Sequence, residues 1–172
     1  MIPIALYFLK LPFDPQTVEV QALENVGGKD FVSTGAIPDF SFRLLESAAK
    51  DPNSRARLEG KTVTLIGQFS PTAEQSQFGL TRLKMACCAA DAIPINAILM
   101  VNPEQWKTLP TSEKQYLRKL NRNWVEVEGR IYFFPRGNGR DYVSAVVIFP
   151  TKEKSLKKLI KKVKRPQDPF LQ

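Results

Sequence analysis

The sequence predicts a mainly β domain with minor α content, and three observations support this fold class. Five segments after residue 60 have the alternating or continuous apolar pattern of strands. One helical pattern separates the third of these segments from the fourth. The chain of 172 residues is 43% hydrophobic and 24% charged, which is typical of a globular domain. Three strands, a helix and two strands is the order of a five-stranded OB-like barrel.

Two elements are expected before the barrel. Residues 1–39 form an N-terminal arm or the remnant of a membrane anchor, because the apolar run at residues 2–9 is shorter than the roughly 20 residues that cross a bilayer. The alternative for this run is a buried first strand. Residues 40–49 have helical apolar spacing, with Asp39 or Ser41 as the N-cap. We expect Asp51-Pro52-Asn53 to end this helix.

The barrel with its preceding helix is expected to occupy residues 40–150. Its five strands are predicted at residues 61–69, 78–86, 93–101, 124–134 and 142–149. A helix is predicted between the third and fourth strands, near residues 112–120, with Ser112 as its cap. Gly67 and Gly129 fall in mid-strand, where a small barrel needs tight bends.

The last 22 residues, 151–172, form a basic tail. Eight Lys and Arg against two acidic residues give the tail a charge of +6 out of the +8 of the whole chain. Its apolar residues have the i, i+3, i+4, i+7 spacing of a basic amphipathic helix: Leu156, Leu159, Ile160 and Val163. Such a helix suits an anionic membrane surface, contacted through Lys157, Lys158, Lys161 and Lys162, or an acidic partner. The alternative is a closing helix that docks on its own domain.

The residue inventory excludes most routes to hydrolytic catalysis. With no histidine, the chain has no Ser-His-Asp or Cys-His relay and no histidine-containing zinc motif. Glu126 and Glu128 share one strand face, but this i, i+2 spacing is typical of a solvated face rather than of an acid-base pair. We therefore expect no enzymatic activity.

The residues most indicative of chemistry are Cys87, Cys88 and Asp91. In a regular strand the two thiols would point to opposite faces, so one metal ion would require the strand to end in an irregular turn here. Thiolates would then select zinc or copper(I), and a water or a partner would complete the ligand set. The alternative is that both cysteines are small apolar residues at the end of a strand.

Nucleic-acid binding is the runner-up function. Phe78, Arg82 and Lys84 share a face of the second predicted strand, and Arg130 and Tyr132 share a face of the fourth. Aromatic and basic residues interleaved on an OB face are typical of single-strand binding. Two carboxylates on the face of Arg130 would repel phosphates, so nucleic acid is not the expected partner.

Several sequence strings carry a family resemblance. They are Gly60-Lys61-Thr62-Val63, Phe78-Gly79-Leu80-Thr81-Arg82, Cys87-Cys88-Ala89-Ala90-Asp91-Ala92, Trp124-Val125-Glu126-Val127-Glu128-Gly129 and Pro169-Phe170-Leu171. Over about residues 40–172 the chain resembles the carboxy-terminal domain of the YcgQ-like uncharacterised proteins. The resemblance implies a smaller permease subunit that works beside a large multi-pass permease-like protein and handles a metal, particularly zinc.

The sequence therefore predicts a non-enzymatic accessory or binding domain of a membrane permease-like system, with zinc as the implied metal. A single-stranded nucleic-acid-binding module and a structural protein-protein interaction subunit are the alternatives. The expected location is at a membrane, either peripheral or through an anchoring segment before the barrel.

Overall fold

The structure is a computed structural model that describes residues 41–85, 92–136, 141–167 and 170–171. The predicted N-terminal arm, the predicted metal ligands Cys87, Cys88 and Asp91, and the tip of the last hairpin lie outside these residues. Within the described ranges, no helix has both the length and the apolar character needed to cross a membrane.

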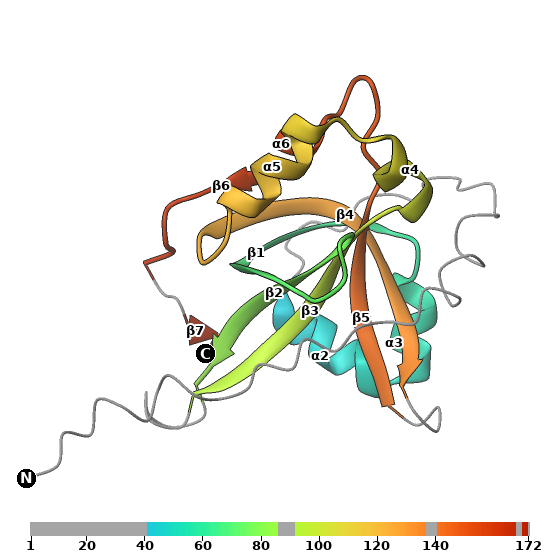
Figure 1. The fold of residues 1–172 in the computed structure, drawn as a ribbon. Coiled ribbons are helices and arrows are strands. Elements are labelled where there is room, and N and C mark those ends of the chain that lie inside the picture. Colours follow the sequence, from blue (N-terminus) through green and yellow to red (C-terminus); the bar gives the residue numbers. More distant parts are fainter. Residues whose placement is uncertain (1–40, 86–91, 137–140, 168–169, 172) are drawn as a thin grey trace, which may run out of the picture.

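Five strands close into a barrel, which confirms the predicted OB-like fold (Figure 1). The strands are β1 (Thr62–Pro71), β2 (Gln77–Lys84), β3 (Ile93–Val101), β4 (Trp124–Arg136) and β5 (Asp141–Ile148). They are hydrogen-bonded in the order β1-β2-β3-β5-β4, and the pairing of β1 with β4 closes the ring. All pairs are antiparallel except β3 with β5.

The two mid-strand glycines lie where the barrel wall is too close for a side chain. A Cβ on Gly67 would lie 2.8 Å from Cγ of Leu80, and one on Gly129 would lie 2.6 Å from Cγ1 of Val146. Both distances are well below van der Waals contact, so the tight curvature of this small barrel needs glycine at both positions.

Two helices cover one end of the barrel. In α2 (Phe42–Lys50), Ser41 is the N-cap as predicted, its hydroxyl accepting from the backbone N–H of Leu44. The sequence also predicted that Asp51-Pro52-Asn53 ends this helix, and it does, but the same residues begin a second helix, α3 (Pro52–Leu58), that was not predicted. Asp51 caps α3 by accepting from the N–H groups of Asn53 and Ser54, and Pro52 fits the first helical position.

The connection between β3 and β4 holds two helices, where the sequence predicted one. They are α4 (Pro103–Thr108) and α5 (Thr111–Lys119). Pro110 separates them because it lacks the N–H that would continue α4. The predicted cap at Ser112 is wrong, since this residue lies inside α5, which begins one residue earlier without a side-chain cap.

The predicted C-terminal basic helix is wrong beyond its first turn. After α6 (Leu156–Leu159) the chain becomes a strand, β6 (Ile160–Lys162), which pairs antiparallel with residues 125–127 of β4. Leu156, Leu159 and Ile160 are buried in the barrel core. The tail is therefore a closing element. Its pairing satisfies backbone N–H and C=O groups of β4 that would have no partner if the tail continued as a helix.

The chain then returns to β2. The two-residue strand β7 (Phe170–Leu171) pairs in parallel with Leu83 and Lys84 at the end of β2. The tail thus contacts the barrel at two separate places, which ties it to the domain along its length.

Candidate binding cavity

A cavity of about 570 Å³ lies at the end of the barrel covered by α2. It is bounded by α2, the end of β2 and the beginnings of β3 and β5. Its lining residues are Leu45, Glu46, Ala49, Lys50, Lys84, Ile93, Pro94, Ile95, Asn96, Asp141, Tyr142, Val143 and Ser144. This volume is in the range of small-molecule sites, and the mixture of apolar walls with a few charged groups is typical of them.

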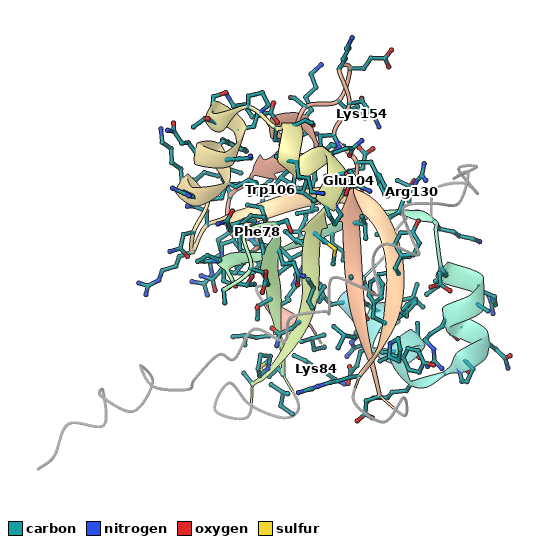
Figure 2. The ribbon with its side chains drawn as sticks, turned by 45° about the vertical axis from the view of Figure 1, so that its right-hand side comes forward. Phe78, Lys84, Glu104, Trp106, Arg130 and Lys154 are labelled. Carbon is teal, nitrogen blue, oxygen red and sulfur yellow. The ribbon has the colours of Figure 1, made fainter. Side chains whose placement is uncertain are left out.

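The charged part of the cavity is centred on Glu46. One carboxylate oxygen accepts from Lys84 of β2 at 3.0 Å, and the other accepts from Lys50 of the same helix at 3.2 Å. The hydrogen bond from Lys84 is the largest cause that lowers the pKa of Glu46 below its usual value, and Lys50 adds to it. Glu46 and Lys84 therefore join α2 to the barrel across the cavity. Lys84 is labelled near the lower end of the molecule in Figure 2.

The Glu46–Lys84 pair gives a pH-dependent prediction. Because the folded state lowers the carboxyl pKa, the pair stabilises the protein above the usual value of 4.5 and loses this contribution as the pH falls through the lowered pKa. Both side chains are partly exposed, so Lys84→Met is expected to lower the free energy of unfolding by about 0.5–1 kcal/mol at pH 7. Denaturant titrations should show this difference disappearing as the pH falls below the lowered pKa of Glu46, where the carboxylate is protonated.

A matched control is available on α4. Lys107 and Glu104 also form an ion pair at 3.0 Å, but their side chains are 70% and 79% exposed. Lys107→Met should change stability by less than Lys84→Met at pH 7. Equal losses in the two variants would show that the cavity pair contributes nothing specific.

The predicted metal ligands belong to a segment that joins two cavity-lining residues. Lys84 and Ile93, which both line the cavity, are Cα partners at the ends of β2 and β3. Cys87, Cys88 and Asp91 lie between them in the sequence, outside the described residues. β2 ends at Lys84, so the strand predicted to reach residue 86 is shorter than expected. In the part of the chain that the structure describes, no three Cys, Asp or Glu side chains are grouped to hold a metal ion.

The two aromatic residues predicted for a nucleic-acid face are buried in two separate apolar clusters. Phe78 lies in the barrel core, where it stacks on Phe69 at 5.0 Å and meets the edge of Trp106 at 6.1 Å (Figure 2). Tyr132 is also buried, in an apolar cluster with residues of β3, β4 and β5, and burial raises the pKa of its hydroxyl. Neither ring is presented for stacking with a base.

The opposite surface of β2 and β3, where OB folds often bind oligonucleotides, carries a different set of side chains. Its paired positions are Thr81 with Asn96 and Leu83 with Pro94, and the Thr81 hydroxyl lies 2.8 Å from Oδ1 of Asn96. These four residues are neutral and none is aromatic. This face therefore lacks the cations and rings on which single-strand binding depends.

Glu126 and Glu128 lie on the outer surface of β4, as predicted, and they do not form an acid-base pair. Lys161 lies 3.7 Å from Glu126, and Lys154 donates to Glu128. Each carboxylate is thus paired with a lysine of the tail. These pairings could not be predicted from the amphipathic spacing of the tail, because they form only when the tail packs against β4.

Sequence reasoning also missed the cavity. Its walls come from four parts of the chain, namely residues 45–50, residue 84, residues 93–96 and residues 141–144. The sequence signal that pointed to this region was the pair of adjacent cysteines followed by Asp91, in the segment that links two of those parts.

No family model and no curated protein matches this sequence. Among solved structures, the chain is similar to a small single-stranded DNA binding protein from Mycoplasma pneumoniae, with 13% identity, a TM-score of 0.32, and coverage of 62% of this chain and 94% of that one. It is also similar to an aspartyl-tRNA synthetase of Leishmania major Friedlin, with 16% identity, a TM-score of 0.33, and coverage of 74% of this chain but only 25% of the synthetase. At these TM-scores neither similarity carries an argument about function.

Proposed function

We propose that this chain is a non-enzymatic binding domain whose ligand site is the cavity at the α2 end of the barrel. The observation that carries the proposal is the position of the cavity at the ends of β2 and β3, the two strands joined by the segment with Cys87, Cys88 and Asp91. A ligand in this cavity would meet the carboxylate of Asp141 and would lie beside the chain ends that lead to the thiols, whereas Glu46 is held by Lys84 and Lys50.

The ligand that fits this residue content best is a thiophilic cation, with zinc first. Thiolates supply the soft donors that zinc and copper(I) prefer, and carboxylates supply additional oxygen donors for zinc. In the resemblance to YcgQ-like proteins, such a domain is an accessory part of a membrane permease-like system. We propose the same role here, with the multi-pass permease-like protein as partner.

The proposal is tested by zinc titration of the reduced protein against a chromophoric chelator. Cys87→Ser and Cys88→Ser are expected to weaken zinc binding at least tenfold while the chain remains folded, because serine does not replace a thiolate ligand. Asp141→Asn reports whether the cavity carboxylate contributes. Glu104→Gln, on the exposed surface of α4, is the control and should bind zinc as the unchanged protein does.

Two results would contradict the metal proposal. One is unchanged zinc affinity in both serine variants. The other is a loss of stability in these variants with no metal binding by the unchanged protein, which would mean that the thiols serve only in packing. An oligonucleotide titration at two salt concentrations, run in parallel with the zinc titration, tests the nucleic-acid alternative.

A further inference from the structure

The fold places a second basic segment beside the tail. The backbone N–H of Leu156 donates to Glu113 of α5 at 3.0 Å, and the hydroxyl of Tyr116 donates to the carbonyl of Ile160 at 2.8 Å. The two contacts advance together along both segments, so α5 and the tail run side by side in the same direction (Figure 1). Lys157 also lies over the ring of Tyr116, 5.8 Å from its centre.

This arrangement gathers the excess positive charge of the chain in two neighbouring segments. Residues 103–123 and 151–167 together hold thirteen Lys and Arg and three Glu, an excess of +10, whereas the whole chain carries +8. The rest of the chain is therefore slightly negative. We define the basic cap as six exposed cations of α5 and the tail: Arg118, Lys119, Lys157, Lys158, Lys162 and Lys164.

Of the acidic groups near the tail, Glu126 and Glu128 are paired with other lysines, and Glu113 accepts from the backbone N–H of Leu156. Lys154 and Lys161 pair with Glu128 and Glu126 on the surface of β4. Among the described residues, no carboxylate lies within ion-pair distance of the six cap cations. The cap thus keeps its positive charge for a partner outside the barrel.

We propose that the basic cap is a docking surface for the anionic headgroups of a membrane. Three of the four apolar residues in the predicted stripe of the tail, Leu156, Leu159 and Ile160, are buried in the core, so we expect attachment to be electrostatic and not through an inserted amphipathic helix. Two aromatic rings near the cap, Trp106 and Tyr116, are half-buried against the core and lie under Lys114 and Lys157. A lysine-rich surface whose nearby rings pack inward fits lipid headgroups better than single-stranded nucleic acid.

The position of the cap has a geometric consequence. It lies at the end of the barrel opposite α2 and α3, the end that holds the cavity (Figure 1). A domain bound to a membrane through the cap would direct the cavity away from the lipid. This inference does not depend on what the cavity binds.

The test is co-sedimentation of the full chain with vesicles of phosphatidylcholine alone and with about one third phosphatidylserine. We expect binding to the anionic vesicles that falls steeply between about 0.05 and 0.5 M salt. Two double variants test the two halves of the cap: Arg118→Gln/Lys119→Gln on α5 and Lys157→Gln/Lys162→Gln on the tail. Each should weaken vesicle binding about tenfold or more, because every Lys or Arg near an anionic surface adds a similar amount to the binding free energy. The matched control is Arg43→Gln/Arg57→Gln, two exposed arginines of α2 and α3.

Circular dichroism of each variant establishes that it is folded. The proposal is overturned if anionic vesicles are not bound, if the control weakens binding as much as the cap variants, or if only the tail variant and not the α5 variant has an effect. Binding to a single-stranded oligonucleotide without binding to vesicles would assign the cap to nucleic acid instead. Zinc titration of the same variants distinguishes the two proposals, because the cap residues do not line the cavity and their substitution should leave zinc binding unchanged.

Discussion

A chain truncated before residue 151 is expected not to fold. The truncation removes Leu156, Leu159 and Ile160, which are at most 5% exposed and belong to the main core. Large-to-small changes at such positions destabilise by about 2–5 kcal/mol each, against a total stability of about 5–15 kcal/mol for a domain. Loss of the pairing between β6 and β4 adds to this effect. Circular dichroism and a thermal melt of the truncated chain measure the result.

Point variants separate the core contribution of the tail from its charge. Leu156→Ala and Ile160→Ala should each lower the free energy of unfolding by about 3 kcal/mol. Lys158→Ala and Lys162→Ala, at exposed positions in the same segment, should change it by less than about 0.5 kcal/mol. A cooperative, wild-type-like melt of the truncated chain would rule out the closing role.

The second large effect is expected for Gly129→Ala. The new Cβ would meet Cγ1 of Val146 at 2.6 Å and the carbonyl oxygen of Val147 at 2.9 Å. The valine side chain has little freedom to rotate, and the carbonyl belongs to the neighbouring strand, so β4 and β5 must move apart. Overpacking of this kind costs about 3 kcal/mol, which urea denaturation would resolve as a lower midpoint.

Glu128→Ala is the matched control for this change. It lies next to Gly129 on the same strand, with a side chain that is 37% exposed on the outer surface. We expect a loss of less than about 1 kcal/mol, from the ion pair with Lys154 alone. If Gly129→Ala were as mild as the control, the strands would not approach each other as closely as the structure has them.

Local patterns were sufficient for most of the barrel. The predicted strand at residues 93–101 coincides with β3, and the strands predicted to begin at residues 61, 78, 124 and 142 begin within one residue of those positions. Alternation of side chains is a property of the single strand, so the sequence shows it directly. The same alternation placed Phe78, Arg82 and Lys84 on one face, but it did not reveal that Phe78 lies in the barrel core and that Lys84 lines the cavity, because both depend on how the sheet closes.

The tail shows where local patterns stop being decisive. Of the four residues in the predicted apolar stripe, Leu156, Leu159 and Ile160 are buried and Val163 is half-buried. The spacing of the first three also fits a turn of helix followed by a strand. The choice was made by β4, whose residues 125–127 had backbone groups to pair. No feature within residues 151–172 carries that information.

By itself the sequence determined the order of the five strands along the chain, the absence of histidine chemistry, the mid-strand glycines at positions 67 and 129, and the excess of positive charge. Only the tertiary structure decided which surfaces those residues form. The cavity unites residues about 100 positions apart, and α5 joins the tail to make the basic cap. The physical reason is that periodicity reports the environment of one segment, whereas a site or a charged surface is created by contacts between segments that are distant in the chain.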